Sequence, residues 1–138
     1  MDDDILGSLV RIFSFPTNVD SRGSLLALEF AELPFRPERA FVTRVSEAGT
    51  QRGGHAHRDC RQLLVSLAGE IDVEIAHGGK TAQARLDTTG RGLLIEPTVW
   101  SRLIFASADA QLLVLADRPY DPAGYVDEWG DPIAPAVR

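Results

Sequence analysis

The chain is divided into many short apolar or alternating runs separated by turn residues, and this spacing limits what it can fold into. In residues 71–76, the apolar side chains of Ile71, Val73 and Ile75 alternate with smaller or charged ones, the period-two pattern of a strand with one buried face. A Gly-Gly pair follows that suits a tight hairpin. No segment of a dozen residues keeps a helical period, so we expect no long helix. The pattern predicts an antiparallel all-β sandwich or barrel.

The other runs have lengths and β-branched or aromatic contents typical of strands. Strands are expected over residues 9–15, 24–30, 40–45, 61–67, 71–76, 81–86, 92–96, 100–106 and 111–116, with a polar break at 16–22. A chain of 138 residues fits one domain, here 1–138, and residues 1–7 are expected to be disordered or loosely attached. Four prolines predict an irregular C-terminal strap over residues 118–138, with room for one helical turn.

Charge and cysteine content exclude several classes of function. The formal net charge of −6 argues against nucleic-acid and membrane partners, although a local arginine cluster still allows a small phosphorylated ligand. Cys60 is the single cysteine, so no intrachain disulfide can form, which fits a reducing compartment. The N-terminus is acidic and no run reaches the ~20 apolar residues of a membrane span. We therefore expect a cytoplasmic protein.

Two of the three histidines lie in one short motif, which reads Arg52-Gly53-Gly54-His55-Ala56-His57. On a strand, His55 and His57 point to the same face and can serve one substrate. Such a pair holds a transition metal in some proteins and moves protons near neutral pH in others. The alternative, that two surface histidines happen to alternate, stays open on the residues alone.

A cupin metal site resembles this motif, but it adds a carboxylate a few residues later and a third histidine on a later strand. Here the carboxylate position holds Gln62 and the third-histidine position holds Arg102. An amide is a poor metal ligand and a guanidinium has no lone pair to donate, so we predict no bound metal and no cofactor. Arg52 and Arg102 are candidates to hold an anion or an oxyanion, or else are solvated surface cations. Trp100 is a candidate to stack on a base or sugar, or else packs in the core or at the rim.

Further motifs surround the histidine pair. They read Asp20-Ser21-Arg22-Gly23-Ser24-Leu25, Leu33-Pro34-Phe35, Gly92-Leu93, Pro97-Thr98-Val99-Trp100, Leu113-Val114-Leu115-Ala116, Tyr120-Asp121 and Tyr125-Val126. Over residues 20–129, the chain resembles the cupin-type sugar 3,4-ketoisomerases that act on dTDP-4-keto-6-deoxyglucose. The Arg52–His57 block with its following Gln62 is the most specific part of the resemblance.

The resemblance implies a cupin domain, that is, a double-stranded β-helix or jelly-roll barrel. It implies a metal-independent isomerase of deoxysugar biosynthesis that moves the carbonyl of a dTDP-linked 4-keto-6-deoxyhexose from C4 to C3 through an enediolate. By position, His55 and His57 are the acid/base pair, and Arg22 and Arg52 contact the diphosphate or the enediolate. Gln62, Trp100 and Arg102 complete the predicted substrate site. A homodimer with exchanged N-terminal strands is also implied, and residues 9–15 would supply the exchanged strand or pair within their own chain.

The chain departs from the family at one stretch. The family usually reads Arg-Val-Tyr-Tyr where this chain reads Arg39-Ala40-Phe41-Val42, so the active-site tyrosine of the family is absent. That loss favours a second hypothesis, a non-catalytic nucleotide-sugar-binding cupin module. A third hypothesis, a metal-dependent cupin such as a dioxygenase, is disfavoured by Gln62 and Arg102.

Overall fold

The computed structural model describes residues 4–126, and its regular elements are β-strands and two short 3-10 turns. In chain order the elements are β1 (Asp4–Ile5), β2 (Val10–Ser14), β3 (Thr17–Asp20), β4 (Gly23–Leu26), η1 (Phe30–Glu32), β5 (Arg39–Arg44), β6 (Thr50–His57), β7 (Gln62–Ala68), β8 (Ile71–His77), β9 (Lys80–Leu86), β10 (Arg91–Ile95), β11 (Trp100–Phe105), β12 (Gln111–Ala116), η2 (Pro122–Gly124) and β13 (Tyr125–Val126). Within this range no helix is both long and apolar enough to cross a bilayer.

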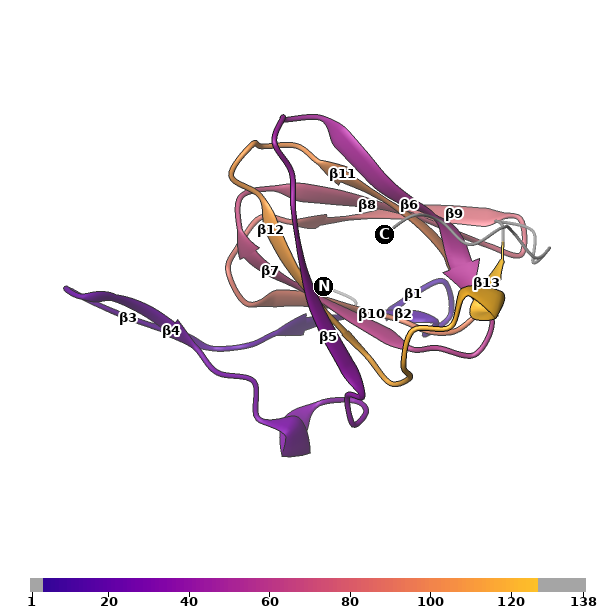
Figure 1. Ribbon diagram of the computed structural model, residues 1–138, viewed down its shortest axis with the longest axis horizontal. Helices are drawn as coiled ribbons and strands as arrows, with labels where there is room; N and C mark the ends of the chain where they lie inside the picture. Colours follow the sequence, from indigo (N-terminus) through magenta and orange to yellow (C-terminus); the bar gives the residue numbers. More distant parts are fainter. Residues whose placement is uncertain (1–3, 127–138) are drawn as a thin grey trace.

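The strands form two sheets that face each other, and a separate hairpin (Figure 1). The larger sheet has the order β1-β2-β10-β7-β12-β5, the smaller one β13-β6-β11-β8-β9, and β3 pairs with β4 alone. The strand pairs are antiparallel throughout. This architecture confirms the predicted all-β fold class. It also places β6, which carries the histidine pair, beside β11.

The main core lies between the two sheets, and the alternation read from the sequence builds it. The side chains of Ile71, Val73 and Ile75 on β8 are fully buried, and they join Phe105 of β11 and Leu112 of β12 in one cluster. Each such side chain contributes roughly 1.5–3 kcal/mol on burial. The core therefore ties the smaller sheet to the larger one and holds β11 in place beneath the site.

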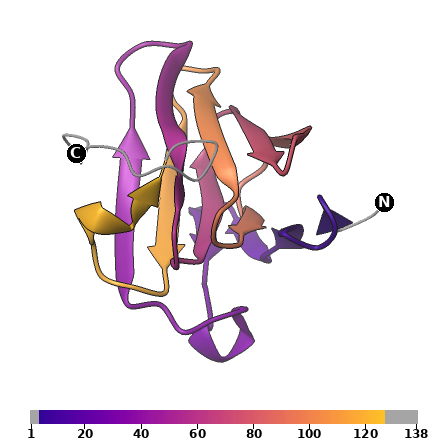
Figure 2. The same cartoon turned by 90° about the vertical axis from the view of Figure 1, so that its right-hand side faces the viewer.

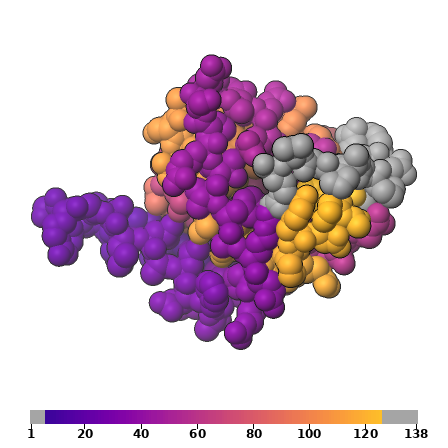
Figure 3. Space-filling view, in the orientation of Figure 1, coloured from indigo at the N-terminus to yellow at the C-terminus, as the bar shows by residue number. Residues whose placement is uncertain are grey.

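The N-terminal third differs from the prediction. Residues 17–20, expected to be a polar break, form β3 and pair with β4, whereas the strand expected over residues 24–30 ends at Leu26. The cause is the turn, where the Asp20 carboxylate accepts hydrogen bonds from the Arg22 backbone and guanidinium at 2.8 and 2.7 Å. This side-chain turn closes a hairpin that projects away from the barrel, as the space-filling view shows (Figure 3).

A second apolar cluster covers the outer face of the larger sheet. Leu63, Val65, Leu94 and Leu115 are buried there under partly buried apolar side chains that follow the hairpin, namely Leu26, Leu28, Leu33 and Phe35. Arg61 fixes this covering segment, because its guanidinium binds both Glu96 oxygens at 2.8 and 2.9 Å and the Pro34 carbonyl at 3.0 Å. The larger sheet is thus buried on both faces near its centre.

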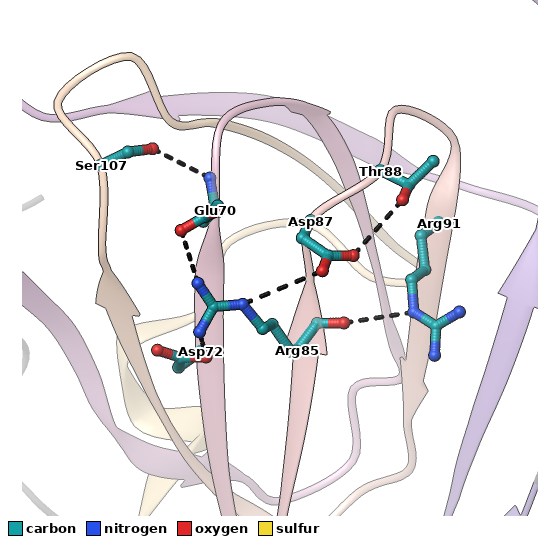
Figure 4. A network of polar contacts seen from close by, with 7 residues as sticks. All are labelled: Glu70, Asp72, Arg85, Asp87, Thr88, Arg91 and Ser107. Atoms are coloured by element: carbon teal, nitrogen blue, oxygen red, sulfur yellow. Dashed lines mark hydrogen bonds and ion pairs between the residues drawn. The ribbon is translucent and has the colours of Figure 1, made fainter.

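The exposed edge strand β9 carries charge, which discourages pairing with another chain. Arg85 lies among three carboxylates, those of Glu70, Asp72 and Asp87 (Figure 4). The Ser107 hydroxyl accepts from the Glu70 backbone at 2.9 Å and so joins the next loop to this network.

The two ends of the chain are described in part. Asp4 and Ile5 pair with β2 as β1, and residues 1–3 of the segment expected to be loosely attached lie outside the described residues. Of the predicted strap, residues 118–126 are irregular except for η2 and β13, and the remainder lies outside the described residues. η2 and β13 lie against β6, at the edge of the smaller sheet (Figure 2).

Candidate active site

His55 and His57 point to the same face of β6, as their spacing predicts, and both line one cavity. Their ring centroids are 5.2 Å apart and their planes are perpendicular. The cavity has a volume of about 670 Å³ and lies between the two sheets. Apolar side chains, including Leu64, Leu103 and Val114, form part of its wall, and the histidines belong to its polar part.

A bulge in β6 brings a third predicted residue to this cavity. The pairing with β11 shifts so that Ser101 faces His55 while Arg102 faces Gly53, which leaves Gly54 as an extra residue in β6. Gly53 and Gly54 both have positive φ angles, +85° and +86°, that glycine adopts without steric cost. Without the extra residue, side chains three positions apart would point to opposite faces. With it, Arg52 and His55 line the same cavity.

Gln62 contacts the second histidine. Its amide Nε2 lies 3.4 Å from His57 Nε2. At this distance the two groups are within reach of a hydrogen bond, in which the amide nitrogen can only donate. Gln62 is therefore placed to orient the His57 ring.

Burial keeps both imidazoles neutral. It lowers the pKa of His55, and it lowers the pKa of His57 to about 4, where the neighbouring His55 and Arg39 act in the same direction and Asp59 opposes them. A neutral imidazole at pH 7 is able to accept a proton at once. Both imidazoles can therefore accept a proton at pH 7, and the lowered pKa makes His57 a weaker base than an ordinary histidine.

Tyr125 completes the group around the histidines. β13 pairs with β6 so that Tyr125 lies directly opposite His57, and paired residues project to the same face of a sheet. Its ring centroid is 4.6 Å from each of the two imidazole centroids. The sequence indicated Tyr125 only as part of a closing motif, because nothing in the strap's composition predicts pairing with β6.

The strap is held at both ends of η2. The Asp121 side chain caps it by accepting from the Ala123 backbone at 3.0 Å, and the Gly124 carbonyl accepts from the Arg58 backbone at 2.6 Å. A second cavity of about 240 Å³ lies beneath the strap, and it shares His57, Gln62 and Tyr125 with the larger one. Tyr125 therefore lies between the two cavities.

The structure does not bring the other predicted residues to the histidines. Ser101 and Leu103 face the larger cavity, so the alternation of β11 turns Arg102 to the outer face, where it pairs with Glu74 at 2.6 Å. Trp100 lies beside Arg102, whose guanidinium carbon is 5.7 Å from its ring, and it does not line either cavity. Ser101, which the sequence analysis did not single out, occupies the inward position.

Arg22 lies at the tip of the projecting hairpin, where its side chain is 88% exposed and paired with Asp20. Its own chain does not place it near the histidines. Phe41 and Val42 line the larger cavity where the family tyrosine was expected, so neither position carries a phenol hydroxyl. Within residues 4–126, no three His, Cys, Asp or Glu side chains gather as a metal site would require.

A barrel of two antiparallel sheets with a histidine pair projecting into its cavity from one strand defines a cupin. Solved cupin-type sugar enzymes confirm this fold. An rmlC epimerase from Mycobacterium tuberculosis aligns with a TM-score of 0.74 at 16% identity, covering 91% of this chain and 71% of that one, which shows the fold alone.

The family is more specific. Residues 8–133 match the family described as FdtA: WxcM-like, C-terminal. The TDP-4-oxo-6-deoxy-alpha-D-glucose-3,4-oxoisomerase of Aneurinibacillus thermoaerophilus is 32% identical over 120 residues, covering 86% of each chain. The WlaRB TDP-quinovose 3,4-ketoisomerase of Campylobacter jejuni aligns with a TM-score of 0.78 at 31% identity, covering 87% of this chain and 93% of that one. A mutant of the 3,4-ketoisomerase QdtA from Thermoanaerobacterium thermosaccharolyticum was solved with TDP-4-keto-6-deoxyglucose. It aligns with a TM-score of 0.81 at 25% identity, covering 88% of each chain.

The chain belongs to this family of sugar 3,4-ketoisomerases. The family and the class of enzyme, an isomerase, are as the sequence predicts. The roles of individual residues rest on the geometry described above.

Proposed function

We propose that this protein is a metal-independent isomerase that moves the carbonyl of a TDP-linked 4-keto-6-deoxyhexose from C4 to C3 in deoxysugar biosynthesis. The observation that carries the proposal is the pair of half-buried, neutral imidazoles, with ring centroids 5.2 Å apart, on the wall of a cavity of about 670 Å³. The relatives that act on TDP-linked keto-sugars support the substrate class.

The reaction needs one proton taken from carbon, one returned to carbon and one moved between two oxygens, with no net redox change. One histidine takes the proton from C3, the C3–H electron pair forms a C3–C4 double bond, and the C4 carbonyl pair moves to its oxygen. A histidine then returns a proton to C4, and the C3 hydroxyl becomes the new carbonyl as its proton passes to the C4 oxygen, which ends as a hydroxyl. His55 and His57 are the two groups that line the cavity and can carry these protons.

The intermediate is an enediolate, and its charge needs a partner. Arg52 lies on the same wall and is positioned to pair with the enediolate oxygen or with the diphosphate of the substrate. Gln62 acts through His57, whose ring it contacts at 3.4 Å. Arg102 and Trp100 are left out of this proposal because they lie on the outer face of β11.

We further propose that the protein is a homodimer. The hairpin of β3 and β4 exposes 76% of Val19 and 62% of Leu25, and a two-stranded hairpin is marginally stable by itself. A second copy would cover these side chains. Arg22 of each chain would then lie near the cavity of the other chain. Within one chain, β2 pairs with β10, so the hairpin is the element available for exchange.

Light scattering should give twice the mass of one chain, and a Val19→Lys, Leu25→Lys variant should run as a monomer. A monomeric wild-type protein would contradict the dimer.

Turnover of TDP-4-keto-6-deoxyglucose to a 3-keto product tests the function. His55→Asn and His57→Asn should each reduce turnover by at least ~100-fold, because each removes a group that transfers a proton. His77→Asn is the matched control, since His77 lies on the turn side of β8 and contacts Thr98 outside both cavities. Full activity in both single variants would overturn the assigned roles.

The absence of a hydroxyl at Phe41 and Val42 favours one competing function, a module that binds a nucleotide sugar without converting it. That module would show a thermal shift with TDP and no product from the keto-sugar. An active, chelator-treated protein would exclude it and would also exclude a metal-dependent cupin.

A further inference from the structure

The strap brings a tyrosine ring against both histidines. The Tyr125 centroid lies 4.6 Å from each imidazole centroid, and the ring lines the same cavity as His55 and His57. The pairing of Tyr125 with His57 across β13 and β6 fixes this position, since a shift by one residue would turn the ring to the other face. The phenol ring of Tyr125 is therefore packed against the proposed acid/base pair.

Arg39 lies near Tyr125, and the two side chains line the smaller cavity together. Arg39 reaches the strap from β5, on the opposite sheet, where it acts to lower the pKa of Tyr125, and its guanidinium carbon lies 4.5 and 5.2 Å from the ring centroids of Phe41 and Tyr120. A guanidinium has donors only, so a hydrogen bond between Arg39 and Tyr125 requires the Tyr125 oxygen to accept. The hydroxyl proton is then free to be donated to another acceptor, and the adjacent positive charge makes it a better donor.

We propose that Tyr125 is a catalytic residue, whose hydroxyl donates a hydrogen bond to the enediolate oxygen, and that Arg39 is the positioning residue that orients it. This inference rests on the proposed isomerase function. Tyr125 supplies from the strap the hydroxyl that Phe41 and Val42 cannot supply from β5. No bond to Tyr125 forms or breaks. The hydroxyl keeps its proton. It stabilises the negative charge of the enediolate from the moment the C3 proton leaves until C4 is protonated.

Several features of the site agree with this role. Burial raises the pKa of Tyr125, against the opposing effect of Arg39, so the phenol stays protonated and able to donate at neutral pH. The two imidazoles are neutral, so Arg52 is the cation on this wall for an oxyanion, and Tyr125 lines the same cavity as a further donor. A preorganised donor in a cavity shielded from water is far more effective than the same donor in bulk solvent.

Tyr125→Phe is the direct test, because it keeps the ring and removes only the hydroxyl. Removal of one oxyanion donor lowers kcat by about 100-fold in comparable sites, and we expect a loss of that order with KM changed by less than about threefold. Tyr120→Phe is the matched control, since it makes the same change on the same strap at a ring that lines only the smaller cavity. We expect it to keep the wild-type kcat.

Arg39 is tested by a double-mutant cycle. Arg39→Gln should lower kcat, Arg39→Lys should lower it less because the positive charge remains, and Arg39→Gln should have little further effect once Tyr125→Phe is present. A merely structural role for Arg39 would instead give additive losses. If Tyr125→Phe lowers the melting temperature too far to be assayed, the kcat ranking of the two Arg39 variants provides the same test.

The outcomes separate the two proposals. An active wild-type protein with an equally active Tyr125→Phe variant overturns this inference and leaves the isomerase function standing. An inactive wild-type protein overturns both. A large kcat loss in Tyr125→Phe with unchanged Tyr120→Phe supports the inference.

Discussion

Tyr125 and His57 lie directly opposite each other across the β13–β6 ladder, with their ring centroids 4.6 Å apart. The first belongs to the C-terminal strap and the second to the motif that gave the earliest indication of function. The site is therefore assembled from two distant parts of the chain, and the strap is one wall of it. This arrangement and the barrel that supports it lead to the three predictions below.

The first prediction concerns pH and His57. Its folded-state pKa of about 4 lies below the ordinary histidine pKa of 6.5, so the unfolded chain binds more protons between these values. The free energy of unfolding should therefore fall as the pH drops from about 6.5 to about 4, by roughly 1–3 kcal/mol from this group. Urea titrations across this range would measure it.

His57→Asn is the control for the pH prediction. The variant cannot take up this proton, so its stability should depend less on pH in the same window. The neighbouring charged groups Asp59 and Arg39 and the second histidine remain in place. An unchanged pH dependence in the variant would show that the loss of stability comes from other groups.

The second prediction separates two arginines that the sequence treated alike. Arg52 lines the larger cavity, whereas Arg102 is bound to Glu74 on the outer face. Arg52→Ala should lower kcat/KM by at least ~10-fold, because an ionic contact of this kind contributes about 1.5–3 kcal/mol. Arg102→Ala should leave kcat/KM within about twofold and cost at most ~1 kcal/mol of stability. Steady-state kinetics of both variants would measure the two kcat/KM values. A larger loss in Arg102→Ala than in Arg52→Ala would contradict the placement of β11.

The third prediction concerns the loop after β7. Gly69 has a φ of +72°, and a Cβ there would lie 2.5 Å from Ala110 Cα and 2.6 Å from Ser107 Oγ. Gly69→Ala should therefore destabilise the fold by about 3 kcal/mol, from strain and overpacking together. Gly78→Ala, at a φ of +57° with open space around it, should cost only about 1 kcal/mol of strain. Denaturant unfolding of both variants measures the difference, and equal losses would contradict it.

The sequence predicted the strands of the barrel well where period-two alternation faces a buried core. The run at residues 71–76 became β8 (Ile71–His77) almost unchanged because the side chains of its inward face are fully buried. The prediction from the sequence was wrong at β3, because the hairpin is built by the Asp20 turn and buries little of its surface. A pattern of burial cannot indicate an element that is largely exposed.

Part of the site could also be predicted, from the geometry of a strand. The same-face geometry of His55 and His57 follows from strand spacing alone. The placement of Arg52 depends on the bulge at Gly54, and the exclusion of Arg102 depends on the phase of β11, which a partner strand sets. Tyr125 reaches the site through pairing of a two-residue strand, too short to have a recognisable pattern.

Proton exchange at the sugar ring tests the central claim most directly. The purified, chelator-treated protein is incubated with TDP-4-keto-6-deoxyglucose in D₂O, and the ring is followed by NMR. We predict that deuterium enters at C4 of a new 3-keto product and exchanges at C3 of the remaining substrate, and that both signals are lost in His55→Asn and His57→Asn. A ligand that binds without exchange or product would contradict the account.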